Sequence, residues 1–410
     1  MTSSCLNRLG RALVLLAALL ECSVVAPAES VSAIFANVPP AASPAIPRRA
    51  SIIFIQCDGL GYGDLSCYGQ TKFQTPNLDR LAAEGIRFTN YFAGDAASSP
   101  SCAALLLGRD AGHLKQRADA DVPLAADDII VAQILKNAGY HTGLIGEWNL
   151  GDENSPGAPW KKGFDDFAGY LNAVDAENYY ADYIFRYAPG GVLNPTNNLR
   201  EDFLGREMLY PNTGGNKGQY IPDLLTKATL NSVKINQPDK FNQFRPFFLL
   251  LNYTLPHAGK NLVVPTDAPF SEEPWPQPEK NKAAAIARLD GYVGQLLDQL
   301  QKLDLTNNVV IFFTGDTAPK KSDGEDPAFF HSNISTNDLR VPMIVRWPGK
   351  IPAGRVSGLK WSPRDFLPTA AEIGYVNPMP ASDGISMLPV LLGQPGTTTN
   401  VVPDRMNISY

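Results

Sequence analysis

The stretch SIIFIQC, residues 51–57, decides how this chain folds. It is apolar and rich in β-branched side chains, and the sequence DGLG at residues 58–61 ends it with a turn. A short, continuous apolar run of this kind predicts a strand that is buried on both faces. Similar runs follow at 246–253 (PFFLLLNY), 308–314 (NVVIFFT) and 341–347 (VPMIVRW).

Helical patterns separate these strands along the chain. We expect helices at 78–84, 101–107, 125–138, 280–303 and 365–373, and a further strand at 141–148. Apolar strands that alternate with helices predict an α/β fold with a mostly parallel central sheet and helices on both faces. Residues 151–220 and 258–280 are rich in Gly, Pro and aromatic side chains, and we expect long loops there.

The first residues have the pattern of an export signal. Arg8 and Arg11 precede the short apolar run ALVLLAALL at 12–20, and Ala26-Pro27-Ala28 offers a small-residue cleavage site. This pattern predicts a signal peptide at residues 1–28, cleaved after Ala28, and the apolar run is too short to span a bilayer. We expect a secreted or periplasmic protein without a membrane span, with a Pro- and Ala-rich linker at 29–49 and one α/β domain at 50–410.

The charge balance excludes one class of partner. The chain has 410 residues, with 35 Lys and Arg against 41 Asp and Glu, and a net charge of −6. Binding to a nucleic-acid backbone depends on an excess of basic side chains. We therefore expect no nucleic-acid partner.

Polar side chains follow the predicted strands where the strands end. Asp58 follows the first strand, Glu147 and Asn149 end another, and His257 and Asp316 follow two more. In an open α/β sheet the ligand crevice lies outside the carboxyl ends of the strands. Each residue alone has a simple alternative, since an Asp often starts a turn and a loop His often makes a structural hydrogen bond. Their joint placement predicts a functional site.

The sequence SSPS at residues 98–101 adds a second feature. Ser99 suits the N-cap of a helix and Pro100 suits its first turn, which places Ser98 just before the helix N-terminus. Backbone N–H groups there favour an anion. Ser98 could therefore act as a nucleophile on a phosphoryl or sulfuryl centre, and the alternative is that these serines only cap the helix.

The order of these segments resembles the sulfatase family. The resemblance covers residues 50–393 through SIIFIQCDGLGYGDLSCYG, QTPNLDRLAAEGIRFTNYF, SSPSCAALLLGR, AQILKNAGYHTGLIGEWNLG, RPFFLLLNYTLPH, NNVVIFFTGD, LRVPMIVRWPGKIPAGR and SDGISMLPVLLG. It implies the alkaline-phosphatase-like α/β fold and hydrolysis of sulfuric esters. It also implies one calcium ion, held by acids and an amide, and a formylglycine made at Ser98.

The metal positions depart from the family pattern. Where the family has two adjacent Asp, this chain has Asp58 followed by Gly59, and where the family has Asp-Asn, it has Asp316 followed by Thr317. Calcium takes about six or more oxygen ligands. Asp58 and Asp316 are the candidate metal ligands, with Glu147 as an additional candidate, and the calcium ion is in doubt.

The cationic positions depart as well. The family's Arg, Lys and His stand here as Cys102, Glu147 and Asn149, and a second Lys falls by spacing at His331. His257 is retained. Losing one such donor from a preorganised site typically costs about 2.7–4 kcal/mol, so several losses could abolish useful turnover. The catalytic candidates are Ser98, His257 and His331, and the substrate-binding candidates are Asn149 and Thr317.

Three functions are compatible with these residues. The first is an exported sulfatase-family protein, possessing weak, atypical or no activity, that binds a sulfated small molecule or glycan. The second is a working Ser-type sulfatase acting on sulfated carbohydrate or aryl sulfate esters. The third is a phosphate-ester hydrolase using Ser98, which would want two metals and more ligands than four His offer. Only residues 394–410 follow the last matching segment, so we expect the family's small C-terminal subdomain to be missing.

Overall fold

The computed structural model describes residues 48–394 except 117–121, 194–195, 197, 258–261 and 318–338. The fold lies in the unit Arg49–Tyr410. The predicted signal peptide, most of the predicted linker and His331 lie outside the described residues. Those predictions therefore stay predictions.

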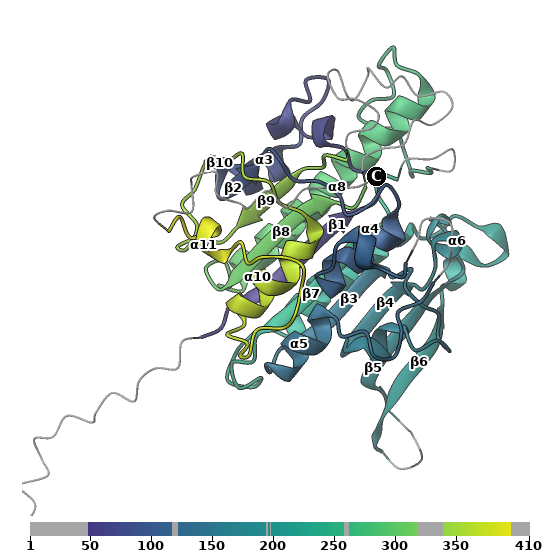
Figure 1. The fold of residues 1–410 in the computed structure, drawn as a ribbon. Coiled ribbons are helices and arrows are strands. Elements are labelled where there is room, and N and C mark those ends of the chain that lie inside the picture. Colours follow the sequence, from purple (N-terminus) through teal and green to yellow (C-terminus); the bar gives the residue numbers. More distant parts are fainter. Residues whose placement is uncertain are drawn as a thin grey trace, which may run out of the picture. The chain divides into compact units, whose positions relative to one another are not determined.

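The described strands form one ten-stranded sheet in the order β10-β2-β9-β8-β1-β7-β3-β4-β5-β6 (Figure 1). The strands are β1 Ser51–Cys57, β2 Ile86–Phe88, β3 His141–Glu147, β4 Asp166–Tyr170, β5 Tyr183–Leu193, β6 Arg200–Met208, β7 Phe247–Tyr253, β8 Val309–Gly315, β9 Met343–Arg346 and β10 Arg355–Ser357. The central strands β8, β1, β7, β3 and β4 are parallel. The pairs β8–β9, β9–β2, β4–β5 and β5–β6 are antiparallel. The prediction of a mostly parallel centre is confirmed.

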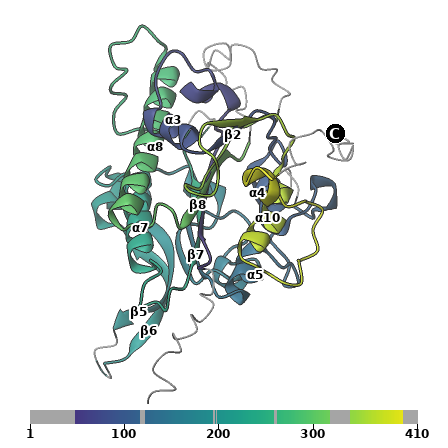
Figure 2. The same ribbon diagram turned by 90° about the vertical axis from the view of Figure 1, so that its left-hand side faces the viewer.

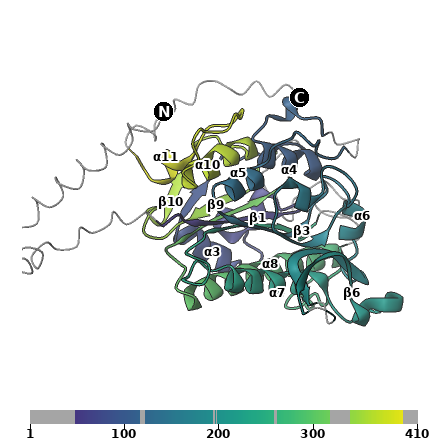
Figure 3. The same cartoon turned by 90° about the horizontal axis from the view of Figure 1, so that it is seen from below.

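Helices cover both faces of this sheet. They are α3 Pro76–Ala83, α4 Ser98–Leu107, α5 Val131–Asn137, α6 Ala173–Ala176, α7 Ile221–Ile235, α8 Gln277–Lys302, α10 Phe366–Ile373 and α11 Leu388–Leu391. Figure 2 and Figure 3 show α3, α7 and α8 on one face and α4, α5 and α10 on the other. No helix in the described part of the chain is long and apolar enough to cross a membrane.

Strand β1 shows why the apolar run folds as it does. Ile52 and Phe54 point into the core shared with α4, α5 and α10, and Ile53 and Ile55 point into the core shared with α3 and α8. All four side chains are fully buried. Burying one such side chain stabilises the fold by about 1.5–3 kcal/mol. The phenyl ring of Phe54 also packs on Phe366, with ring centroids 4.4 Å apart.

Two details of the predicted organisation are wrong. Residues 151–220, expected to be loops, contain β4, β5 and β6. These strands extend the sheet towards its edge, and the side chains of β6 are exposed or half-buried, so no apolar run marks it. The strand expected at 341–347 is shorter, Met343–Arg346, and runs antiparallel to β8.

Candidate functional site

The predicted site residues come together at the carboxyl ends of the parallel strands. Strands β1, β3 and β8 end beside a cavity of about 150 Å³, and the loop after β7 completes its wall. The cavity is lined by Asp58, Gly59, Ser98, Glu147, Asn149, Ala173, Ala176, Glu177, Thr254, His257 and Thr317. A smaller hollow of about 20 Å³ adjoins it and reaches Asp316. Every predicted site residue that the structure describes thus lines one of these two spaces.

Asp58 and His257 form a pair across the cavity wall. The backbone N–H of His257 donates to the carbonyl oxygen of Asp58 at 2.9 Å, and its ring Nδ1 hydrogen-bonds a carboxylate oxygen of Asp58. Burial opposes the imidazolium charge, yet the hydrogen bond and negative charge of Asp58 outweigh it and raise the pKa of His257 to about 9. His257 is therefore a cation at neutral pH, and Asp58 is already its partner.

The carboxylate of Asp316 accepts three hydrogen bonds. The donors are the backbone N–H of Gly59 at 3.0 Å, the hydroxyl of Thr317 at 3.1 Å and the hydroxyl of Ser98. Gly59 has a φ of 66°, a conformation that glycine adopts without strain. Burial and the charge of Asp58 raise the pKa of Asp316 to about 7 despite these hydrogen bonds.

Helix α4 places Ser98 at the cavity, but not as predicted. The helix begins at Ser98, with Ala97 at the N-cap position, so the prediction that Ser99 caps the helix is wrong. The hydroxyls bind neighbouring loops instead of the helix end. Ser99 donates to the carbonyl oxygen of Asn149 at 2.8 Å, and Ser101 donates to the carbonyl oxygen of Asp316 at 2.6 Å. These bonds fix the start of α4 against the ends of β3 and β8.

Glu147 ends β3 inside a group of like charges. Burial, together with the charges of Asp58 and Asp316, raises the pKa of its carboxyl group to about 8, while the charge of His257 opposes the shift. Its elevated pKa therefore reflects its burial first and the neighbouring carboxylates second. Glu177, at the end of α6, adds another carboxyl group to the same cavity.

The smaller hollow contains residues that the sequence did not indicate as functional. Gln56 of β1 and Asn252 of β7 line it, together with Cys102. The side-chain oxygens Gln56 Oε1 and Asn252 Oδ1 are buried and accept no hydrogen bond within the described part of the chain. Asn252 Nδ2 donates to the carbonyl oxygen of Glu147 at 2.9 Å, which fixes the orientation of the amide. The feature of the sequence that could have indicated Gln56 and Asn252 is that each is a polar residue inside an otherwise apolar strand.

Cys102 has no reactive character. Its side chain is buried, and burial together with the charges of Asp316 and Glu147 raises the pKa of its thiol to about 12. A thiol with that pKa stays protonated and is a poor nucleophile.

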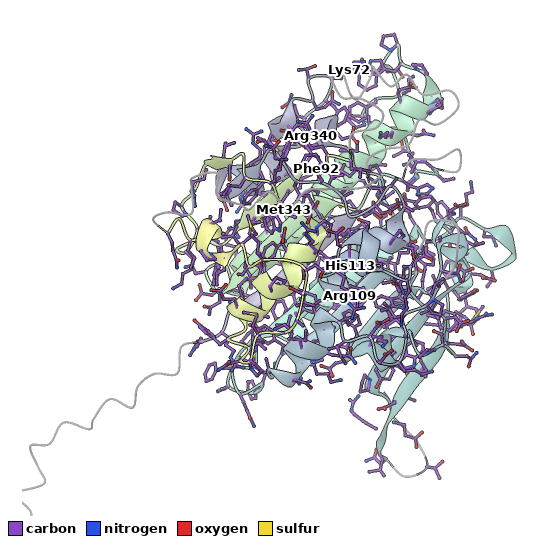
Figure 4. All side chains as sticks on the ribbon, viewed as in Figure 1. Lys72, Phe92, Arg109, His113, Arg340 and Met343 are labelled. Carbon is purple, nitrogen blue, oxygen red and sulfur yellow. The ribbon has the colours of Figure 1, made fainter. Side chains whose placement is uncertain are left out.

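Other residues of the matching motifs serve the fold instead of the cavity. Figure 4 labels Arg340, which lies just before β9, and Met343, the first residue of β9. The guanidinium of Arg340 lies 5.0 Å from the ring centroid of Tyr62, and the hydroxyl of Tyr68 donates to the carbonyl oxygen of Met343 at 2.7 Å. Arg109, also labelled, lies 3.6 Å from a carboxylate oxygen of Asp128.

A family comparison agrees with this architecture. The Sulfatase family model matches residues 50–374, which is most of the chain. The chain belongs to the sulfatase family. Sulfatases generally use a calcium ion and a formylglycine residue.

Several named sulfatases are similar in sequence. Human arylsulfatase A is 32% identical over 378 residues, covering 86% of this chain and 70% of that protein. The N-acetylgalactosamine-6-sulfatase of Canis lupus familiaris is 29% identical over 372 residues, covering 85% of this chain. The N-acetylgalactosamine-6-O-sulfatase of Bacteroides thetaiotaomicron is 27% identical over 434 residues, covering 88% of this chain and 80% of that protein. This chain spans about two thirds of the length of the mammalian N-acetylgalactosamine-6-sulfatases.

Solved structures show the same fold. Ps i-CgsB, in complex with k-i-k-neocarrahexaose, matches with a TM-score of 0.65 and 26% identity, over 84% of this chain and 76% of that chain. BT4656, in complex with D-glucosamine-2-N,6-O-disulfate, matches with a TM-score of 0.66 and 21% identity, over 86% of this chain and 82% of that chain. At that identity the second likeness concerns the fold alone.

The sulfatase calcium ion does not fit the described residues. The carboxylate of Asp58 binds His257, and the carboxylate of Asp316 accepts from Gly59, Thr317 and Ser98. Within the described ranges no three His, Cys, Asp or Glu side chains are grouped so that they could hold a metal ion. Calcium needs about six or more oxygen ligands, and Asp58, Asp316 and the additional candidate Glu147 are not grouped so that they could supply three of them.

Proposed function

We propose that this sulfatase-family protein hydrolyses sulfate esters weakly or not at all. The supporting observation is the charge of its cavity. Four carboxyl groups, on Asp58, Glu147, Glu177 and Asp316, line the two adjoining spaces. His257 is the one cationic side chain among the described lining residues, and Asp58 neutralises it.

This charge is unfavourable for sulfate-ester chemistry. The transition state of sulfate transfer carries negative charge on the sulfuryl oxygens, and positive groups or metal ions stabilise such charge. Glu147 stands at the position where the family resemblance implies a Lys, so the change adds repulsion as well as removing attraction. Cys102, at the implied Arg position, supplies neither charge nor a strong hydrogen-bond donor.

A Ser-type sulfatase is the second candidate function. One observation favours it, because Ser98 lies at the N-terminus of α4, lines the cavity and donates its hydroxyl to Asp316. Names of similar proteins make a sulfated sugar or aryl sulfate the ligand class to test first. The fold alone would not distinguish this function from the first.

Turnover of an aryl sulfate tests the proposal. The native protein and Ser98→Ala should hydrolyse para-nitrophenyl sulfate at the same background rate, with and without added Ca²⁺, between acidic and neutral pH. Turnover that depends on Ser98 and rises with Ca²⁺ would support the second candidate and overturn the proposal. Ser98 is a suitable site for this substitution because its hydroxyl reaches Asp316 from the helix start, outside the apolar core.

We further propose that the chain is exported through residues 1–28. The charged start, short apolar run and small-residue site support this. N-terminal sequencing of the protein from its own host should give a chain that starts at Glu29. A chain that still starts at Met1 would contradict export by this signal.

A further inference from the structure

The smaller hollow and the main cavity share several walls. Asp58, Ser98, Glu147 and Asn149 line both, so the two spaces form one site at the carboxyl end of the sheet. The hollow of about 20 Å³ has room for one group about the size of a water molecule, such as a single NH₂ or NH₃⁺ group, and the cavity of about 150 Å³ in front of it accommodates the rest of a small ligand.

The walls of the hollow include two buried acceptors that receive no hydrogen bond from the described residues. Gln56 and Asn252 are 5% and 9% exposed, and their side-chain oxygens have no donor within the described residues. A buried acceptor without a partner destabilises the fold, so a group that donates hydrogen bonds there would relieve that cost. The carboxyl groups of Glu147 and Asp316 face the same hollow.

The grouping of the acidic side chains argues for an organic cation over a metal ion. The acidic side chains of the described residues are not grouped so that one metal ion could contact three of them. A guanidinium or ammonium group carries several N–H donors that point in different directions. Such a group can donate to amide and carboxyl oxygens together without the six or more oxygen ligands that a calcium ion needs.

We propose that this joined site binds a small organic cation with several N–H donors, a guanidinium or a primary ammonium group, in place of an anionic sulfate. One NH₂ or NH₃⁺ end of the cation donates to Gln56 Oε1 and Asn252 Oδ1 inside the hollow, and the carboxyl groups of Glu147 and Asp316 accept its other N–H groups. This assignment concerns the cavity of the proposed function but does not need it, because a cation site and sulfate-ester turnover are measured separately.

Titration calorimetry of the protein with methylguanidinium tests the assignment. Methylguanidinium should bind, and tetramethylammonium, which has the charge but no N–H donor, should bind at least about tenfold more weakly. Ethylammonium as a third probe separates a preference for guanidinium from one for ammonium. Equal affinity for methylguanidinium and tetramethylammonium, no heat with methylguanidinium, or its displacement by Ca²⁺ would overturn the assignment.

Variants locate the binding site. Gln56→Leu removes one orphan oxygen and Glu147→Gln removes one carboxyl group, and each should weaken methylguanidinium binding at least about fivefold. Glu272→Gln, which removes a carboxyl group from an exposed position, should leave binding unchanged. Since Gln56 lies in the core strand, Glu147→Gln keeps the test valid if Gln56→Leu does not fold. Equal affinity in the native protein and Glu147→Gln would place any bound cation elsewhere and overturn the assignment.

The two proposals fail in different ways. If no probe cation binds and no sulfate ester is hydrolysed, the cation site is wrong and the proposed loss of turnover stands. If Ser98-dependent sulfate release is found, the proposed function is wrong whatever the calorimetry shows.

Discussion

The carboxyl group of Glu147 lies in surroundings that disfavour its charged form. Burial and the charges of Asp58 and Asp316 raise its pKa to about 8. The folded state therefore binds more protons than the unfolded state between the ordinary glutamate pKa and about 8. The free energy of unfolding therefore falls as pH rises from the ordinary glutamate pKa to about 8.

Replacing Glu147 by Gln should remove this pH dependence. Above about pH 8, Glu147→Gln should have a free energy of unfolding about 1–3 kcal/mol higher than that of the native protein, because an unfavourable buried charge is gone. It should therefore unfold at a higher urea concentration. At pH 4 the two should be alike, since the native carboxyl group is then protonated in both states. Urea unfolding at both pH values checks this, with Glu272→Gln as the exposed control. A variant less stable than the native protein at pH 9 would contradict this explanation of the raised pKa.

The Asp58–His257 pair also makes the free energy of unfolding fall as pH rises, but in a higher pH range than Glu147 does. The pKa of His257 is raised to about 9 in the fold, so its contribution is fully present below its ordinary pKa and is lost as pH rises through about 9. His257→Gln should therefore destabilise the protein by about 1–2 kcal/mol at pH 6 and by much less at pH 10. His113→Gln, whose ring is mostly exposed, is the control. A loss of equal size at both pH values would show that the ring acts through packing alone.

Strands β3 and β7 meet closely at the end of β3. Gly146 has a φ of 116°, and a Cβ atom there would lie 1.9 Å from the backbone carbonyl oxygen of Asn252. Only glycine fits this approach, which sets the position of Glu147 relative to Asn252. The pairing of β3 with β7 therefore determines part of the geometry of the candidate site.

Gly146→Ala should disturb both the fold and the site. The added methyl group must push β3 away from β7, and we expect a loss of at least about 2 kcal/mol in the free energy of unfolding. Gly112→Ala, where an added Cβ meets no atom within 4 Å, is the control. Thermal unfolding measures both, and a Gly146→Ala protein as stable as the Gly112→Ala protein would contradict the close packing.

The central strands could be predicted because each is marked by the residues of its own segment. A short apolar run such as SIIFIQC predicts a doubly buried strand, and the polar residues that follow parallel strands meet at one edge of the sheet. Strand β6 could not be predicted in this way, because it is an edge strand whose side chains are exposed or half-buried and it has no apolar pattern. Gln56 and Asn252 could be recognised as neighbours in one site only from the structure, because the pairing of β1 with β7 places them side by side.

The whole molecule depends on two cores that share the sheet. Phe54 packs against Phe312 and Phe366 in the core under α4 and α10. Phe54→Ala should destabilise the protein by about 3–5 kcal/mol through lost burial and a cavity. The exposed Phe241→Ala should change the unfolding midpoint little. Urea unfolding of both variants compares them, and similar midpoints would contradict the described core.

The molecule retains the sulfatase fold, and we propose that its sulfate-ester chemistry is weak or lost. The mass of the tryptic peptide from Phe88 to Arg109, taken from protein purified out of its own host, decides this proposal, because formylglycine at Ser98 makes that peptide lighter by two hydrogens. We expect the unmodified mass. The lighter peptide would show that the chain is matured as a sulfatase, and it would contradict the proposed loss of activity.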